Sequence, residues 1–343
     1  MSFRNSDLAE EFPDIASVRW DRLRTLGRFH RVAGFVWDWL SSSGTAVPQD
    51  VLIELSAEAA SIASSNLRVA AESRNLQADF REAGVPLLFL KGMAVGALAY
   101  RNPSLKSAID IDLLIDPPDL LKAAELLGSR GYAIAIPSDA RTLGAWHNRS
   151  KESVWVNHQT GLQIDLHTRV ADTPRLIARI DVHSPRQMVA IHSGISLPTF
   201  ADEELFAYLA VHGAWSAWYR IKWLSDFAAL LHGRPPDEIE RLHRRSIELG
   251  AARSAGQALL LADRLFGTLR LAPGLRKRLE QDRTTRRLAR AAFRMLASEG
   301  GEPTERPIGT LKIHYLELLV VPGLGFKISE IARQAAKFAR NRA

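Results

Sequence analysis

The sequence contains no cysteine in its 343 residues. This absence excludes disulfides, thiolate nucleophiles and zinc sites with cysteine ligands. The sequence also lacks an apolar run long enough for a membrane-spanning helix, and its polar, acidic first residues do not have the pattern of an export signal. We therefore expect a cytoplasmic protein with no membrane partner.

Several common catalytic and phosphate-binding motifs are missing as well. The sequence has no G-x-x-x-x-G-K-S/T loop, no G-x-G-x-x-G after a strand, no H-E-x-x-H and no G-x-S-x-G. Any phosphate or metal chemistry must therefore rest on other residues.

The charge balance is basic, with 45 Lys and Arg against 38 Asp and Glu and a net charge of +7. Much of the excess lies near residues 276–294, where four arginines at helical spacing would form one stripe on a helix. They are Arg283, Arg287, Arg290 and Arg294. Attraction to a polyanion is one interpretation. A solvated helix face is the other, and the lack of interleaved aromatic residues favours it.

The hydrophobic pattern divides the chain into three parts, 1–83, 84–200 and 201–343. The first part predicts helices, over 19–40 and 51–83. The second predicts short strands over 85–90, 109–115 and 132–136, and a hairpin from 153–158 and 162–167. The third predicts helices again, starting with 202–215, 221–231 and one from 236. We therefore predict an α+β fold, with a small mixed sheet flanked by N-terminal and C-terminal helical regions.

The triplet Asp110-Ile111-Asp112 lies inside a predicted strand. Because side chains alternate along a strand, Asp110 and Asp112 project from one face. Two like charges side by side are unfavourable unless a cation lies between them, and oxygen ligands of this kind suit Mg²⁺. Solvent exposure at a strand end is the alternative, which the apolar residues after Asp112 disfavour. Asp165 and His167 likewise share a face of a second strand, and for these two exposure to solvent remains open.

An ordered set of segments carries a resemblance to a known family. The segments are Leu90-Lys91-Gly92, Tyr100-Arg101-Asn102-Pro103 with Lys106, Asp110–Ile115, Ile164–His167, His212-Gly213 and Lys222–Asp226. Over roughly residues 80–235 this set resembles the bacterial uncharacterised nucleotidyltransferase family of the polymerase-β-like nucleotidyltransferase superfamily.

The resemblance implies Mg²⁺-dependent transfer of a nucleoside monophosphate from an NTP to an acceptor, with pyrophosphate as leaving group. It implies that Asp110, Asp112 and Asp165 are catalytic and hold two Mg²⁺ ions, Asp165 assisting deprotonation of the acceptor. The residues expected to bind the nucleotide are Lys91, Gly92, Lys106, His167 and Lys222.

Separate physical arguments support parts of this assignment. A glycine at a strand-to-helix turn lets backbone N–H groups approach phosphate, and Lys91 can act as a point cation. Two positions depart from the family pattern: Lys106 stands where an arginine is common, and Ile109 is bulkier than expected before the first aspartate.

The acceptor stays open among a small molecule, a peptide and RNA. Two other functions remain as alternatives. One is a catalytically degenerate module that binds a nucleotide or RNA through basic helices near Arg287 and Arg333. The other is a toxin-type transferase that acts on tRNA or a protein.

Overall fold

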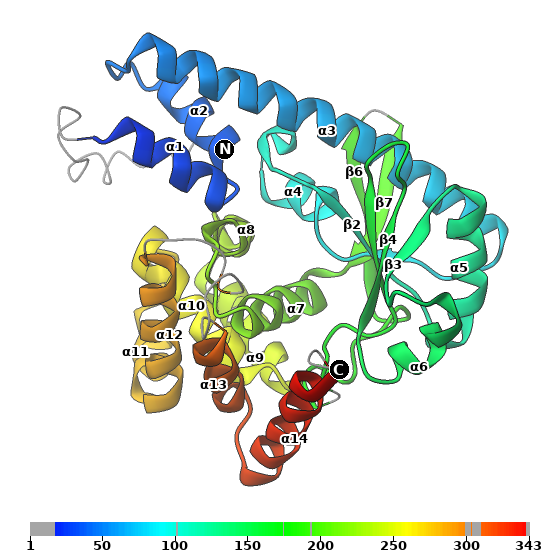
Figure 1. Ribbon diagram of the computed structural model, residues 1–343. Helices are drawn as coiled ribbons and strands as arrows, with labels where there is room; N and C mark the ends of the chain where they lie inside the picture. Colours follow the sequence, from blue (N-terminus) through cyan, green and yellow to red (C-terminus); the bar gives the residue numbers. More distant parts are fainter. Residues whose placement is uncertain are drawn as a thin grey trace. The chain divides into compact units, whose positions relative to one another are not determined.

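The computed structural model describes residues 18–100, 102–173, 175–192, 194–298, 303 and 310–340, with side chains described as far as residue 335. The chain forms two compact units, and Figure 1 traces both. The first runs to Thr168 and includes Arg186–Thr199, and the second consists of Arg169–Pro185 and the chain from Phe200 onward. The three-part division at 83/84 and 200/201 stays a prediction.

The first unit combines helices with all the strands. Its helices are α1 (Trp20–Phe29), α2 (Ala33–Ser42), α3 (Gln49–Glu82), α4 (Met93–Ala99), α5 (Leu120–Ser129) and α6 (Leu143–His147), with 3-10 turns η3 (Pro103–Leu105), η4 (Pro117–Asp119) and η5 (Ala140–Thr142). Its strands are β1 (Leu88–Phe89), β2 (Asp110–Leu114), β3 (Ala133–Ile136), β4 (Glu152–Val156), β5 (Gln163–His167), β6 (Arg186–His192) and β7 (Ile195–Phe200).

The main sheet is small and mixed, as the sequence predicts. Its strand order is β1-β2-β5-β4-β3. Strands β2 and β5 are parallel, and the other pairs are antiparallel, including the predicted β4–β5 hairpin. Strands β6 and β7 form a second, two-stranded sheet that the sequence analysis did not predict. Their signal is weak because β6 buries only two side chains, Val189 and Ile191.

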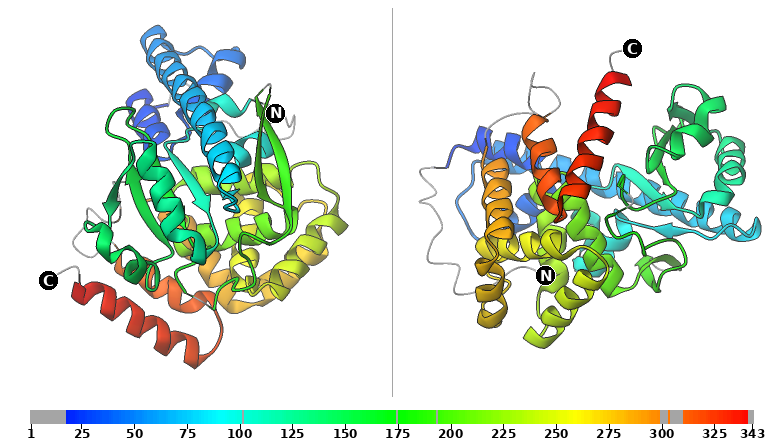
Figure 2. Two further views of the ribbon diagram at one scale, coloured as in Figure 1. Left: turned by 90° about the vertical axis from the view of Figure 1, so that its right-hand side faces the viewer. Right: turned by 90° about the horizontal axis from the view of Figure 1, so that it is seen from below.

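One face of the main sheet is apolar and packs in the core. Ile111 and Leu113 of β2 join a buried cluster with Ile164 and Leu166 of β5. Helices α3 and α5 supply the other side of that cluster, and both lie along the sheet in Figure 2. Because strand side chains alternate, burial of this face fixes which residues of β2 and β5 point the other way.

The predicted helical stretch over 19–40 is divided into α1 and α2. Arg31 adopts a left-handed φ of 57°, and the Val32 N–H donates to the Gly27 carbonyl at 2.8 Å. This backbone pattern ends a helix, but it commonly uses glycine at the left-handed position. Sequence periodicity missed the break because an arginine occupies that position.

The second unit is mainly helical. Its helices are α7 (Asp202–Trp215), α8 (Ile221–Leu231), α9 (Pro236–Glu248), α10 (Ala252–Phe266), α11 (Pro273–Gln281), α12 (Arg283–Leu296), α13 (Leu311–Val320) and α14 (Leu324–Arg340). The helices predicted at the start of this part are confirmed. Within the described ranges, no helix combines the length and the apolar content needed to cross a bilayer.

Candidate active site

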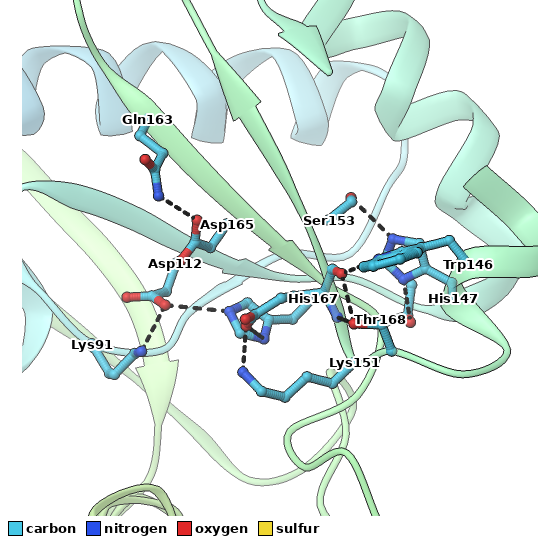
Figure 3. Close-up of polar contacts among 12 residues, drawn as sticks. Lys91, Asp112, Trp146, His147, Lys151, Ser153, Gln163, Asp165, His167 and Thr168 are labelled. Atoms are coloured by element: carbon cyan, nitrogen blue, oxygen red, sulfur yellow. Dashed lines mark hydrogen bonds and ion pairs between the residues drawn. The ribbon is translucent and has the colours of Figure 1, made fainter. Parts of the chain in front are cut away.

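The three predicted aspartates lie on the same face of the main sheet. Asp112 is the register partner of Asp165 on the parallel strand β5, and Asp110 is the partner of Gln163. Register partners on adjacent strands share a face, and so do residues two apart on one strand. The polar face therefore brings together carboxylates that are more than fifty positions apart in the sequence (Figure 3).

Asp112 is held between two nitrogen groups. Its Oδ1 lies 2.8 Å from Lys91 Nζ and 3.3 Å from His167 Nε2, and its side chain is only 2% exposed. A carboxylate can only accept, so His167 donates from Nε2. Burial alone would raise the pKa of Asp112, but Lys91 and His167 together lower it below its usual value. Asp112 is therefore charged and carries a tethered cation.

Asp165 has the opposite electrostatic environment. Burial, together with the negative charges of Asp112 and Asp110, raises the pKa of Asp165 to about 7. The Gln163 amide donates to Asp165 Oδ1 at 2.9 Å and opposes that rise. The neighbouring negative charges thus favour the protonated form of Asp165. A bound cation would lower its pKa again and restore the ionised form.

His167 is fully buried and links two strands, so the exposed alternative for this residue is wrong. Its Nδ1 lies 3.2 Å from Glu152 Oε2, and Glu152 is its register partner on β4. Glu152 in turn pairs with Lys151. Burial, followed by the charge of Lys151, lowers the pKa of His167. Because Nε2 carries the proton that Asp112 accepts, Nδ1 is unprotonated and makes no hydrogen bond to a described residue. The polar row is therefore bonded from Lys91 through Asp112 to His167, and Glu152 lies next to its end.

Glu152 and Gln163 lie beside His167 and Asp165 and were not predicted from the sequence. Both lie on the same face as Asp165, with Gln163 inside the predicted arm 162–167 and Glu152 one residue before the predicted arm 153–158. The alternation along the hairpin was a usable signal, because the hairpin register fixes which residues of the two arms share a face.

A second buried network supports the end of β5. His147 Nδ1 lies 2.8 Å from Thr168 Oγ1, and its Nε2 lies 3.0 Å from Ser153 Oγ. The Trp155 indole N–H donates to the same serine oxygen at 3.0 Å. These bonds tie β4 and β5 together beside His167.

The Lys91-Gly92 turn lies next to β2. The Leu90 N–H donates to the Asp112 carbonyl at 3.1 Å, which positions Lys91 beside that residue. Gly92 has a φ of 61°, and a Cβ built there would lie 3.7 Å from the Asp110 carbonyl oxygen. The left-handed backbone explains the glycine. Its contact with phosphate stays a prediction.

The loop that precedes β2 is anchored by a buried residue of α3. The Asn66 amide donates to the carbonyls of Ser104 and Lys106, both at 2.8 Å, and accepts from the Ala108 N–H at 3.4 Å. Lys106 is only 4% exposed, whereas the side chain of Ile109 is half exposed. Arg101 lies outside the described residues.

Lys222 lies on α8 of the second unit. Its role in nucleotide binding, like that of Lys106 and His167, stays a prediction.

The carboxylates match magnesium in chemistry. All three offer hard oxygen ligands, and the pKa of Asp165 is raised first by burial and then by the negative charges of Asp112 and Asp110. In the part of the chain that the structure describes, no three His, Asp or Glu side chains are already gathered as a ligand set. The Lys91 ammonium instead occupies one Asp112 oxygen.

A small mixed sheet that carries aspartates on one face agrees with what the family resemblance implies. Residues 16–267 match the model of the family described as uncharacterised nucleotidyltransferase, and the chain belongs to this family. No curated protein matches it. The match confirms the family resemblance, and the family suggests nucleotidyltransferase activity. Bacterial origin and membership of the polymerase-β-like superfamily stay predictions.

Proposed function

We propose that the protein is a Mg²⁺-dependent nucleotidyltransferase that moves an NMP group from an NTP to an acceptor in the cytoplasm. The observation that carries this proposal is the register of Asp112 with Asp165, with Asp110 on the same face. In-line displacement at phosphorus needs several carboxylates that converge beside the reacting oxygens.

Each group on the polar face has a distinct task in this proposal. Asp110, Asp112 and Asp165 would hold two magnesium ions, which would neutralise phosphate charge and activate the acceptor hydroxyl. The pKa of Asp165 is raised to about 7 without a metal, and bound magnesium would keep this carboxyl in the ionised form that can assist deprotonation of the acceptor.

Lys91 and His167 act through Asp112. Lys91 holds the Asp112 carboxylate ionised without a metal and can turn its ammonium to the triphosphate when a metal takes its place. His167, buried between Asp112 and Glu152, fixes the orientation of the Asp112 carboxylate.

The test is transfer of label from NTPs into cell extract. Each of ATP, GTP, CTP and UTP is supplied with label at the α- or the γ-phosphate. The proposal predicts that only α-label enters an acceptor, because the γ-phosphate leaves in pyrophosphate. Transfer of γ-label, or no transfer from any of the four by a folded sample, contradicts it.

Replacement of a carboxylate by its amide identifies the site. Asp112→Asn should reduce α-label transfer roughly 100-fold or more, because removing a metal ligand removes several kcal/mol of transition-state stabilisation. Asp38→Asn, at an exposed position of α2, is the matched control and should leave transfer unchanged. Equal activity of the two variants would rule out this assignment.

A further inference from the structure

Helix α12 of the second unit presents an outward row of arginines. Five of them are exposed and recur at spacings of three and four residues, so they share one side of the helix. They are Arg283, Arg286, Arg287, Arg290 and Arg294. The row spans about 17 Å at 1.5 Å per residue. We call these five residues the α12 arginine row.

The charge of the α12 arginine row is not neutralised by ion pairs. None of the five pairs with a carboxylate in the described ranges of the chain, and α12 itself contains no acidic residue. Asp282, which precedes the row, is engaged as the N-cap: its Oδ1 accepts from the Thr284 N–H at 3.0 Å.

Arginines on neighbouring helices behave differently. On α11, Arg276 lies 3.3 Å from Asp263 and 3.2 Å from Glu280, and Arg278 lies 3.0 Å from Glu240. On α14, Arg333 is paired with the buried Glu330. The expectation that the last helix shares the basic surface is therefore not supported at Arg333. Among the described residues, unpaired lysines also lie on α11 and α13, at Lys277 and Lys312, but α12 carries the row of five arginines on one side of a helix.

An aromatic ring accompanies the α12 arginine row. Tyr315 of α13 is 43% exposed, and the Arg287 guanidinium lies 5.5 Å from its ring centroid. The one aromatic residue in the stretch itself, Phe293, is half-buried and covered by the Arg264 guanidinium at 3.7 Å from its ring centroid, but folding brings Tyr315 beside the row. The arginine guanidinium can contact a phosphate, and the exposed ring can provide a stacking surface for a base.

The apolar side of α12 argues against a lipid bilayer as partner. Leu288 and Ala292 are fully buried, and Leu296 is 8% exposed. A helix that lies in a membrane interface needs its apolar face free to enter the lipid. The face of α12 that remains free is the charged one.

We propose that the α12 arginine row and Tyr315 form a binding surface for single-stranded nucleic acid. The arginines contact backbone phosphates, and the Tyr315 ring stacks on a base. This surface does not depend on the activity proposed for the first unit, so Asp112→Asn should leave nucleic-acid binding unchanged.

The first test is the salt dependence of binding by the full chain, measured by fluorescence polarisation. The probes are labelled oligo-U, oligo-dT, an abasic strand of equal length, and vesicles of phosphatidylcholine with phosphatidylserine. Five phosphate contacts on a single strand predict a slope of about −3.5 for log affinity against log salt. Equal binding of oligo-U and oligo-dT indicates phosphate and base contacts alone, and a preference for oligo-U indicates RNA.

Two triple variants of equal charge distinguish the effect of the α12 arginine row from the effect of net charge. Changing Arg283, Arg290 and Arg294 to Ala should reduce the slope by about 2. Changing Arg241, Arg276 and Arg278 to Ala removes the same charge from ion-paired positions and should leave the slope almost unchanged. Circular dichroism checks that both fold. Equal effects of the two variants, or binding of vesicles without binding of oligonucleotides, would overturn the proposal.

Tyr315→Ala tests the stacking contact. It should weaken binding of oligo-U and oligo-dT about fivefold or more and leave the abasic strand unaffected. An equal loss for the abasic strand would refute a role in stacking.

Discussion

Asp112 and Asp165 are chemically identical residues with opposite electrostatics. They face each other across one strand pair, yet the pKa of Asp112 is lowered and that of Asp165 is raised. Lys91 and His167 make the difference, because Lys91 Nζ lies 2.8 Å and His167 Nε2 lies 3.3 Å from Asp112 Oδ1 and both lower its pKa. The pair is therefore divided between a charged ligand and a carboxyl that can take up a proton near neutral pH.

Substitution of Glu152 tests whether the residues behind Asp112 help to position its carboxylate. Glu152→Gln keeps the shape but removes the charge that faces His167 Nδ1 at 3.2 Å. Residues that orient a metal ligand typically contribute 10- to 100-fold, and we expect α-label transfer to fall by about that factor, with little change in KM for the NTP. Glu125→Gln, on the exposed side of α5, is the control. A change in KM alone would contradict a positioning role.

The buried position of His243 on α9 predicts that the stability of the second unit depends on pH. Burial, and then the charge of Arg278, lower the pKa of His243 below 6.5, its ordinary value. As the pH falls, His243 is therefore protonated in the unfolded chain before it is protonated in the folded one. Its contribution to the free energy of unfolding is complete above about pH 7 and is lost as the pH falls through the folded-state pKa. NMR titration should give a pKa below 6.5, and Arg278→Ala should raise it. A pKa above 6.5 would contradict the assignment.

At the scale of elements, the turn after α7 depends on one glycine. A Cβ on Gly213 would lie 2.4 Å from ring carbons of Trp218, which is fully buried. The Trp218 ring is rigid and enclosed, so it cannot move away from an added Cβ at Gly213 without loss of packing energy. The His212-Gly213 segment of the family resemblance thus has a packing explanation.

Two glycine substitutions should have opposite effects. Gly213→Ala should lower the free energy of unfolding by about 1–3 kcal/mol through overpacking. Gly128→Ala, in α5 with nothing within 4 Å of the added Cβ, should raise it by up to about 1 kcal/mol through helix propensity. Urea denaturation of both variants measures these changes. A neutral Gly213→Ala would show that the Trp218 packing is loose.

Elements with strong patterns could be predicted from the sequence, and those set by tertiary contacts could not. The alternation in 109–115 and in 162–167 predicted β2, β5, the common face of Asp110 and Asp112, and the common face of Asp165 and His167. That these two faces coincide was implied only by the family resemblance, because it depends on the parallel pairing of β2 with β5. The strand over 85–90 shrinks to two residues, because only Leu88 and Phe89 pair with β2. Nothing local signals that pairing.

At the scale of the whole molecule, the sequence correctly indicated an α+β protein, and the structure adds a grouping of segments that the hydrophobic pattern does not show. Residues 169–185 belong with the chain beyond Phe200, while 186–199 return to the first unit. Which unit a segment belongs to depends on contacts between residues that are distant in the sequence. The role of Tyr315 was hidden for the same reason, since Arg287 is 28 positions away in the sequence.

The central claim is that the carboxylates of β2 and β5 bind divalent metal beside a triphosphate. Electron paramagnetic resonance of Mn²⁺, a stand-in for Mg²⁺, measures it directly by counting bound ions with and without a non-hydrolysable NTP. The account predicts two ions per chain with the nucleotide, and loss of binding in Asp112→Asn and Asp165→Asn but not in Asp38→Asn. Equal binding by all three variants, or none by the folded wild-type protein, would contradict it.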